Sequence, residues 1–597
     1  MSLIRSMLLC ILIYMIVGGG SHAQVYSPAD PRLPTRWTSE VSPENALSEY
    51  PRPMMVRDHW KNLNGLWDFQ VTSKFRSPGE YHRKILVPYP VESVLSGIKE
   101  TIGAENMVWY RRSFSVENPP QNGRVLLHFG ASDWETHVFV NGDHIGLHQG
   151  GYDSFSFDIT GYLTSGDQVI EVGVWDPTDI GDQPVGKQTH DPRGIWYTAN
   201  TGIWQTVWLE YVPETYIQDL KITPEVDQSR VKVMITAMNG GSELRARVEV
   251  LTDGKVISSS TGYHKQTFYV RIPEPELWSP ENPYLYDLNV SLLDSAGVTL
   301  DQVESYVGMR KISIGRTGDG YTRLFLNNQP LFQLGPLDQG WWPDGLYTAP
   351  TDDALRYDIQ VTKDLGFNML RKHVKVEPQR FYYWCDVMGV LVWQDMPSGG
   401  RRPARIPERS AAAARQFKQE YREMIDGLYN HPSIVMWIPF NEGWGQYRTE
   451  EIVKWTQLHD PTRLVNNASG WADQGIGDVV DRHAYPGPAM HPPENNRASI
   501  LGEFGGQALA IEEHLWIQDF SRAPDHFKTS KSRARLHDEY EQLILALYPL
   551  VEDGLAAAVY TQMTDVESEV NGLMTYDRDV IKFDEEHLRE IHGKLYK

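Results

Sequence analysis

The chain has 597 residues and a formal net charge of −22, and 11% of its residues are aromatic. This length corresponds to several domains, since a single domain rarely exceeds about 250 residues. The strongly negative charge argues against nucleic acid or an anionic membrane as a partner, because both repel an acidic protein. The 19 tryptophans and 30 tyrosines are typical of β-rich domains and also of proteins that stack aromatic rings on sugars.

The first 23 residues are predicted to be a secretory signal. They carry a positive charge at Arg5, an apolar stretch over residues 7–17 and the sequence SHA directly before Gln24, where we expect cleavage. The apolar stretch is shorter than the roughly 20 residues that cross a bilayer, and no later segment is long enough, so no membrane span is expected. Cys385 is then the only cysteine of the mature chain, which excludes an internal disulfide. We therefore expect a bacterial protein exported to the periplasm, secreted, or held at the cell surface.

Two β-sandwiches are predicted next, over residues 24–212 and 213–310. Short alternating runs such as VWYRRSF and RVLLHF, separated by turn residues, are typical of such folds. The Asn141-Gly142 pair between two alternating runs predicts a hairpin. The second sandwich is smaller, and its prolines at 273, 275, 280 and 283 predict loops.

From about Leu324 the pattern changes to short apolar strands alternating with helical stretches. Eight strands can be counted, beginning with LFQLGPL and ending with AAVYTQ. Strand and helix in strict alternation over roughly 275 residues predict a closed (β/α)8 barrel, which we assign to residues 311–597.

Two glutamates follow apolar runs of this barrel. Glu442 ends the fourth predicted strand in IVMWIPFNEGWG, and Glu503 ends the seventh in ASILGEFGG. A single glutamate at a strand end is usually solvated or ion-paired, but two of them at the end of a barrel where catalytic groups are presented indicate glycoside chemistry. Trp437 and Trp444 flank the first glutamate and glycines flank the second, which suits a sugar ring.

These residues resemble glycoside hydrolase family 2, which includes β-galactosidases, β-glucuronidases and β-mannosidases. The motifs LNGLWDF, HVFVNGDHIG and TGIWQTVWLE resemble its sugar-binding jelly-roll domain, and YVGMRKISI resembles the end of its immunoglobulin-like domain. The resemblance implies that the third domain is the family's catalytic barrel. It also implies that Glu442 is the acid/base, Asn441 a ligand of the sugar 2-hydroxyl and Glu503 the nucleophile.

Further substrate-binding residues follow from the same resemblance and from strand ends. An arginine near Glu503 would keep that carboxylate ionised, and a tyrosine hydroxyl could donate a hydrogen bond to it. Trp341 and Trp342 are candidate stacking platforms. The remaining candidates are Arg371, His373, Asp395, His483, Tyr485 and Gln562.

The implied mechanism is retaining, which requires the two carboxyl groups about 5 to 5.5 Å apart. Such chemistry needs no cofactor, and we expect no metal, since no His/Cys cluster has ligand spacing.

The presence of Asn441 together with both glutamates argues against a carbohydrate-binding protein that has lost catalysis. An endo-acting glycosidase such as a mannanase is the less favoured enzyme, because two N-terminal sandwiches would wall the site into a pocket.

Two departures bear on the sugar. Glucuronide-specific members resemble one another in an Asn-x-Lys loop after strand eight, but here the sequence is Asn571-Gly572-Leu573. Arg401, Arg402 or Arg497 could replace that lysine. The sequence GPLDQGWWPDG also replaces the His-Glu ending of strand one that is common in galactosidases. We expect an exo-acting β-galactosidase, with β-glucuronidase as the alternative, and the sequence leaves the oligomeric state open.

Overall fold

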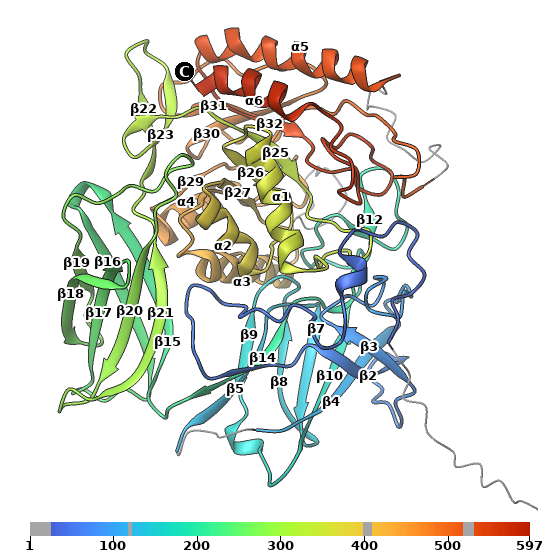
Figure 1. The fold of residues 1–597 in the computed structure, drawn as a ribbon, viewed down its shortest axis with the longest axis vertical. Coiled ribbons are helices and arrows are strands. Elements are labelled where there is room, and N and C mark those ends of the chain that lie inside the picture. Colours follow the sequence, from blue (N-terminus) through green and yellow to red (C-terminus); the bar gives the residue numbers. More distant parts are fainter. Residues whose placement is uncertain (1–25, 117–121, 398–408, 518–529, 597) are drawn as a thin grey trace, which may run out of the picture.

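The computed structural model describes residues 26–116, 122–397, 409–517 and 530–596. Figure 1 shows them as three units, a blue and cyan β-sandwich, a green β-sandwich beside it, and a yellow-to-red barrel. The predicted signal, residues 1–23, lies outside the described part of the chain. Within that part, no helix combines the length and the apolar character needed to cross a membrane.

The first unit is a sandwich of two antiparallel sheets, as predicted. Residues along its strands alternate between buried and partly exposed, so one face of each sheet builds a shared core around Trp67, Phe69 and Val172. The predicted hairpin at Asn141-Gly142 joins β7 (Glu135–Val140) to β8 (Asp143–Gln149), and both turn residues have the positive φ, 52° and 88°, that a tight hairpin turn needs. The larger sheet has the order β3 (Arg83–Val87), β2 (Gly65–Ser73), β4 (Asn106–Phe114), β10 (Gln168–Trp175), β7 (Glu135–Val140) and β8 (Asp143–Gln149). The smaller sheet has the order β1 (Trp60–Asn62), β14 (Val207–Val212), β5 (Arg124–Phe129) and β9 (Phe155–Asp158).

The second unit is a smaller antiparallel sandwich, also as predicted. Its core includes Val233, Val248 and Leu288. Residues 272–285, which hold the four prolines, form the connection between β19 and β20. One sheet has the order β15 (Tyr216–Glu225), β16 (Arg230–Met238) and β19 (Phe268–Arg271), and the other has β18 (Lys255–Tyr263), β17 (Arg245–Thr252), β20 (Tyr286–Leu293) and β21 (Thr299–Val307).

The third unit contains eight parallel strands and confirms the predicted barrel. Before it, a small antiparallel sheet of β22 (Ile312–Arg316), β23 (Thr322–Leu326) and β24 (Gln329–Pro330) packs against β31 and β32. The barrel strands are, in chain order, β25 (Gln333–Asp338), β26 (Met369–Lys372), β27 (Leu391–Asp395), β28 (Ile434–Ile438), β29 (Leu464–Val465), β30 (Val479–Ala484), β31 (Ala498–Gly505) and β32 (Leu555–Thr561). The helices are α1 (Asp352–Asp364), α2 (Gln379–Met388), α3 (Ala411–Leu428), α4 (Thr449–His459), α5 (Arg533–Glu552) and α6 (Glu585–Gly593).

The prediction of strict strand–helix alternation is wrong in one part of the barrel. No helix lies between β29 and β30 or between β30 and β31 among the described residues. Both connections are rich in glycine, proline, asparagine and aspartate, which favour turns over helix. In the order of hydrogen-bonded strands, β29 and β30 are the two outer strands of the eight-stranded sheet. A side-chain hydrogen bond connects them, from Asn466, directly after β29, to Asp481 of β30 at 2.7 Å.

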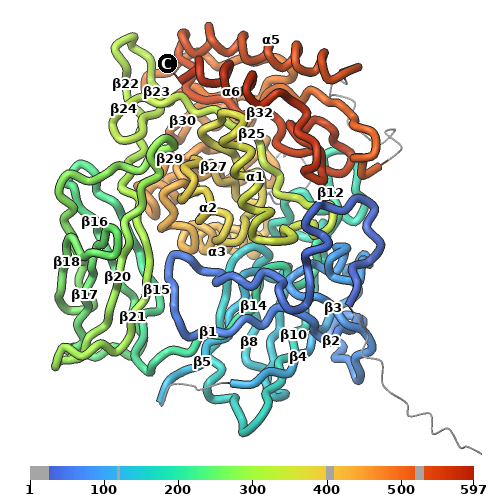
Figure 2. The backbone as a smooth tube through the Cα atoms, in the orientation of Figure 1, coloured from blue at the N-terminus to red at the C-terminus, as the bar shows by residue number. Residues whose placement is uncertain are grey.

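One stretch of the first unit reaches over to the barrel. We call residues 177–201 the bridging segment; it contains β11 (Gln188–Thr189) and β12 (Tyr197–Thr198), which pair in parallel. Figure 2 shows β12 beside the red C-terminal part of the chain. The Thr198 backbone N–H donates to the Glu567 carboxylate at 2.9 Å, and the Ser568 hydroxyl donates to the Gly194 carbonyl at 2.9 Å. The first unit therefore forms part of the wall at the barrel's C-terminal end.

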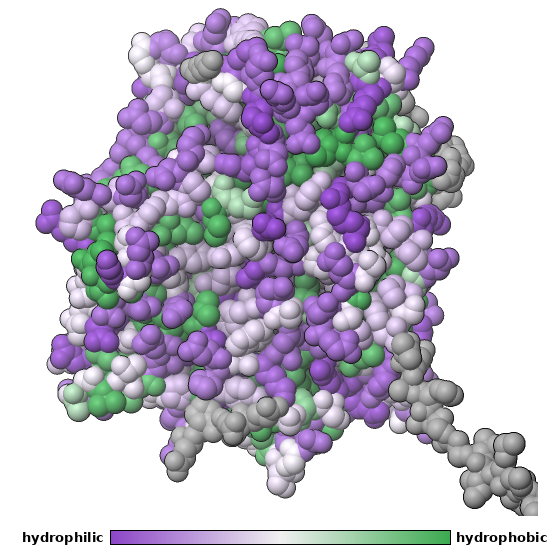
Figure 3. Space-filling model, in the orientation of Figure 1, coloured by the Kyte–Doolittle hydropathy of each residue, from purple (hydrophilic) through white to green (hydrophobic). Residues whose placement is uncertain are grey.

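On the face seen in Figure 3 most residues are hydrophilic, and the apolar ones lie in small groups among them. Scattered apolar residues of this kind are normal for a folded protein surface.

Candidate active site

The two glutamates lie at the C-terminal end of the barrel but are presented differently. Glu503 lies within β31, two residues before its end, and pairs in register with His483 of β30. Glu442 does not end β28 but lies on the turn beyond it, with a φ of 53°. Its backbone N–H donates to the Ser469 carbonyl at 2.8 Å, which fixes the turn against the loop after β29.

His483 lies between the two carboxylates. Its Nδ1 is 2.9 Å from Glu442 Oε1 and 3.4 Å from Glu503 Oε2. The ligand atoms of these three side chains all lie within 4.8 Å of one another. This separation fits the roughly 5 to 5.5 Å between carboxyl groups in retaining glycosidases and is too short for the roughly 6.5 to 9.5 Å of inverting ones.

Glu503 is held in its ionised form. Burial alone would raise its pKa, but the positive charges of His483 and Arg371 outweigh burial, so the pKa is lowered. Arg371 Nη1 is 3.2 Å from Glu503 Oε1, and the Tyr485 hydroxyl donates to Glu503 Oε2 at 2.5 Å. An ionised carboxylate with these partners is the form that a nucleophile requires.

His483 is arranged to carry positive charge. Burial lowers its pKa, but the charge of Glu503 and the hydrogen bond with Glu442 outweigh that effect, so the pKa is raised. Its Nε2 is 2.8 Å from the Ser469 hydroxyl oxygen. Because both ring nitrogens are engaged by neighbouring side chains, the close approach of the three groups is accounted for without a metal ion.

Arg371 joins three strand ends into one network. Its guanidinium contacts both oxygens of Asp395, at 3.1 and 2.9 Å, and donates to Asn441 Oδ1 at 2.8 Å. The Asn441 Nδ2 amide is buried and has no hydrogen-bond partner among the described residues. A buried donor left unpaired is unfavourable, so a hydroxyl of a bound sugar is a suitable partner for it.

His373 belongs to the same network in its neutral form. Its Nδ1 is 3.1 Å from Asp395 Oδ2. Burial lowers the pKa of His373 well below its usual value, and the positive charges of Lys187 and Arg371 act in the same direction. The neutral ring can therefore accept or donate a hydrogen bond at the pocket without adding charge.

Two further predicted ligands, Tyr485 after β30 and Gln562 after β32, contact residues at or beyond the end of β32. The Tyr485 hydroxyl also lies 2.9 Å from the Thr561 hydroxyl, and Gln562 donates to Asn571 Oδ1 and accepts from Gln339, both at 2.9 Å. The structure thus brings Arg371, His373, Asp395, Asn441, Glu442, His483, Tyr485 and Glu503 into one network, with Gln562 at its edge.

The prediction for the two tryptophans is not supported by their position. Trp341 and Trp342 are each 1% exposed. Trp341 packs on Tyr197 and Tyr347, and Trp342 packs on Trp37 and under the guanidinium of Arg578. Both rings are occupied by protein contacts at the domain interface and present no free face to a sugar.

Of the three arginines proposed as replacements for the family's lysine, Arg497 lies among the described residues, and it does not reach the site. Arg497 lies at the start of β31, the end remote from Glu503, and pairs with Asp473 and Glu494. Arg401 and Arg402 lie outside the described residues. Leu573, at the lysine position itself, is buried in an apolar cluster.

Sequence reasoning missed residues contributed by loops. Trp471, in the loop after β29, is 64% exposed, and its ring lies edge-on to His483 with centroids 5.6 Å apart. Trp196 of the bridging segment packs on Trp444 at 5.2 Å. In the sequence, Trp471 is an aromatic residue in a stretch rich in glycine and asparagine, and Trp196 is one of many aromatic residues in a predicted β-sandwich. Neither position indicates that the residue lies near the two glutamates.

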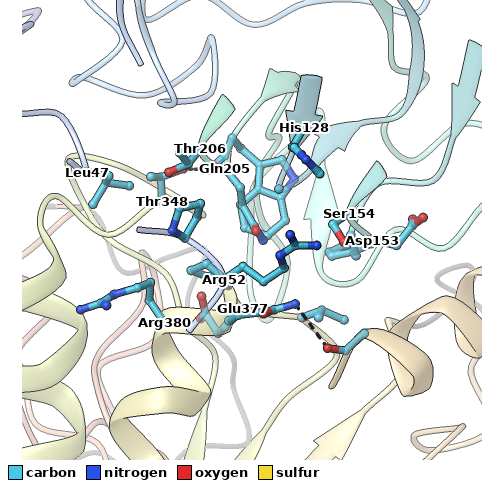
Figure 4. Close-up of a pocket in the computed structure, with 18 of the residues that line it drawn as sticks. Leu47, Arg52, His128, Asp153, Ser154, Gln205, Thr206, Thr348, Glu377 and Arg380 are labelled. Carbon is cyan, nitrogen blue, oxygen red and sulfur yellow. Dashed lines mark hydrogen bonds between the residues drawn. The ribbon is translucent and has the colours of Figure 1, made fainter. Parts of the chain in front are cut away.

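A cavity lies between the first unit and the barrel, and neither glutamate lines it. Figure 4 shows Arg52 and His128 of the first unit facing Glu377 and Arg380 of the barrel across it. Its two arginines are already paired, Arg52 with Glu210 at 2.8 Å and Arg380 with Asp352. We therefore interpret this cavity as part of the domain interface.

Fold and site together define a class, modular proteins in which two β-sandwiches accompany a (β/α)8 barrel with a paired carboxylate centre. Three sequence models of one family match the chain. Residues 40–213 match the model of the sugar binding domain of glycosyl hydrolases family 2, and residues 347–487 match the model of its TIM barrel domain. Residues 215–310, between them, match a third model, which is described simply as glycosyl hydrolases family 2. The chain belongs to glycosyl hydrolases family 2, which confirms the predicted family and domain types.

Individual relatives carry two different names. A putative β-glucuronidase of Formosa agariphila is 30% identical over 371 residues, which are 61% of this chain and 34% of the relative. A β-galactosidase of Alteromonas mediterranea is 25% identical over 479 residues, which are 74% of this chain and 44% of the relative. The chain thus spans less than half the length of these curated relatives. The solved structure of a Bifidobacterium dentium β-glucuronidase complexed with coumarin-3-O-glucuronide has a TM-score of 0.72 at 20% identity, covering 91% of this chain and 98% of that one, and shows a shared fold.

Proposed function

We propose that the protein is a retaining exo-β-glycosidase that removes a terminal β-linked sugar from oligo- or polysaccharide fragments. The observation that carries this proposal is the pair of carboxylates, Glu442 and Glu503, whose oxygens lie within 4.8 Å in unequal surroundings. Glu503 contacts Arg371, His483 and Tyr485, whereas the contact found for the Glu442 carboxylate among the described residues is with His483. Such an inequality assigns different tasks to two otherwise identical groups.

The reaction would proceed in two displacements. Glu503 attacks the anomeric carbon while Glu442, in its acid form, donates a proton to the glycosidic oxygen, so that the aglycone leaves and a glycosyl ester forms. Glu442 then removes a proton from water, which attacks the anomeric carbon and releases Glu503. The imidazole of His483 between the carboxylates would support the change of protonation at Glu442.

Neighbouring groups would orient the sugar. The unpaired Nδ2 of Asn441 is placed to donate to a sugar hydroxyl, and the resemblance makes this the 2-hydroxyl. Asp395 and His373 offer further polar atoms. The exo mode is supported by the bridging segment, whose contacts with the loop after β32 wall one side of the site.

The identity of the sugar and the location of the protein belong to the proposal as well. The sequence favours a β-galactoside, with a β-glucuronide as the alternative, and curated relatives carry both names. The signal-like residues 1–23 and the lone Cys385 support export to the periplasm or beyond.

Hydrolysis by wild type, Glu503→Gln and Glu442→Gln tests the mechanism. On aryl β-glycosides we expect Glu503→Gln to lower kcat/KM by about 1000-fold or more, because the ester can no longer form. Proton NMR of the first product should show the β-anomer, the signature of retention. An α-anomer as first product, or rates unchanged in Glu503→Gln, would contradict the mechanism, and sugar binding without turnover in every form would favour the carbohydrate-binding alternative.

A further inference from the structure

One buried lysine of the first unit lacks the partner that every other buried lysine has. Four lysines are buried among the described residues. Lys372 pairs with Asp338 and Glu377, Lys375 with Glu377, and Lys582 with Asp565, all within 2.9 Å. Lys187 is 5% exposed, and in the described structure its ammonium has neither a hydrogen bond nor an ion pair.

The backbone on both sides of Lys187 is tightly fixed. Gly186 has a φ of 59°, and a Cβ there would lie 2.8 Å from the Val374 carbonyl oxygen and from the Tyr347 hydroxyl. Gln188 donates to Asp133 at 2.7 Å and accepts from the Asn200 backbone at 2.8 Å. Gly186, the residue before Lys187, therefore lies against Val374 in the barrel loop that follows β26, and Val374 is the residue after His373.

The Lys187 ammonium acts by its charge on a residue of the active-site network, His373. It lies 5.5 Å from the centre of the Tyr197 ring. Its charge lowers the pKa of His373 and opposes the effect of burial on the pKa of Glu569. The Glu569 carboxylate accepts a hydrogen bond from the Tyr197 hydroxyl and is itself close enough to Glu503 for their charges to interact.

The Lys187 side chain is buried, but its ammonium makes no ion pair, and Glu569 acts on it only through the longer-range attraction of their charges. A positive charge on a buried side chain is more favourable when a direct partner offsets its desolvation. Natural sites keep such a group where a ligand supplies the missing charge. A carboxylate on the bound sugar would supply a direct partner, and Leu573, which follows β32, is buried in an apolar cluster and offers no charge of its own.

We propose that Lys187, supplied by the first β-sandwich, binds the carboxylate of a uronic acid in the active-site pocket, so that the terminal sugar is a β-uronide. The inference rests on the proposed glycosidase function and names its substrate class. It reverses the order of the two sugars expected from sequence, since the cation missing after β32 is provided by a different domain.

The first experiment measures kcat/KM on two matched pairs of aryl substrates, β-D-galactoside with β-D-galacturonide and β-D-glucoside with β-D-glucuronide. Members of a pair differ only at C6, as hydroxymethyl or carboxylate. We expect wild type to prefer the uronide of at least one pair. Lys187→Met should lower kcat/KM on that uronide by about 10- to 100-fold relative to its neutral partner, and Lys187→Arg should restore most of it. Lys84→Met, which removes a surface lysine of β3 paired with Asp68, is the control and should behave as wild type.

Two results would overturn the assignment of Lys187 and leave the glycosidase proposal standing. One is a preference for the neutral sugars that Lys187→Met does not change. The other is an equal loss on all four substrates together with a lower Tm, which would make Lys187 a structural counter-charge for Glu569.

The second experiment does not depend on turnover. Calorimetric titration of Glu503→Gln with glucuronate, galacturonate, glucose and galactose should show tighter binding of a uronate, weakened at least tenfold when Lys187→Met is added. If the protein binds a uronate through Lys187 but cleaves none of the four substrates, the glycosidase proposal is refuted. The assignment of Lys187 to the carboxylate of the sugar would still stand. No preference for uronates in binding, combined with no uronide cleavage, would refute the assignment.

Discussion

The barrel rim and the bridging segment contribute to the same pocket by different means. At the rim the charges satisfy one another, because Arg371 links Asp395, Asn441 and Glu503 in one buried network. In the bridging segment the anchors are backbone and amide contacts, and its one buried charge, Lys187, is left unpaired. A self-satisfied network suits the chemical step, which must be the same for every substrate. An unsatisfied charge on a separate domain suits discrimination between sugars.

The largest effect is expected from breaking the rim network at Arg371. Arg371→Met leaves Asp395 buried without its counter-charge and raises the pKa of Glu503, so we expect kcat/KM to fall by about 100- to 1000-fold and stability by about 3–5 kcal/mol. Arg371→Lys should restore little of the activity, since one lysine ammonium cannot make the contacts that the planar guanidinium makes with three side chains. Steady-state kinetics and chemical denaturation measure the two effects, and activity close to wild type in either variant would contradict this description of the rim.

The bridging segment can be displaced without touching a charge. Gly186→Ala places a Cβ 2.8 Å from the Val374 carbonyl oxygen, whereas Gly194→Ala, in the same segment and with nearly the same φ of 57°, places it in open space. Both variants carry the strain of a positive φ, about 1–2 kcal/mol, but only Gly186→Ala must also move the backbone beside Lys187. We expect about a tenfold loss of kcat/KM in Gly186→Ala and little loss in Gly194→Ala. Equal losses would show that the position of the segment does not matter to the pocket.

The tuning of Glu503 predicts a pH effect. Tyr485→Phe removes one donor to Glu503 Oε2 and leaves Arg371 and His483 in place. The ionised form loses a hydrogen bond, so the pKa of Glu503 rises and the acid limb of the kcat/KM profile moves to higher pH by up to about one unit. The lowered pKa of Glu503 in the wild type stabilises the fold above the carboxyl's unfolded pKa, and this contribution is lost as pH falls through the folded value. Tyr485→Phe should therefore lose stability at neutral pH relative to pH 3. A limb that moves to lower pH would contradict the assignment of Tyr485.

The difference between the two regions also separates what the sequence could predict from what it could not. Strand periodicity and the strand-end position of Glu503 predicted the barrel and the placement of the rim residues, because residues at strand ends are brought together by the topology itself. The same reasoning put Glu442 at a strand end, although it lies on the turn beyond β28. Lys187 gave no signal, since its neighbours His373 and Glu569 come from another domain and are far away in the chain. Trp341 was predicted to stack on a sugar because it follows a strand end, but a tryptophan in that position is equally suited to packing in a domain interface, where the structure places it.

The smallest kinetic effect is expected from Trp471, which tests whether a residue of a barrel loop also takes part in discriminating between substrates. Its ring stands edge-on to His483 and is 64% exposed, so it takes little part in the fold and is free to contact a sugar beyond the cleaved bond. Trp471→Ala should raise KM by about 3- to 10-fold on substrates with a sugar aglycone, change KM less on short aryl glycosides, and leave Tm unchanged. Phe75→Ala, which removes a first-domain aromatic that is 73% exposed, is the matched control and should alter neither. If Trp471→Ala acts equally on both substrate types, the ring contacts the terminal sugar itself, and part of the discrimination assigned to the bridging segment must then come from the barrel rim.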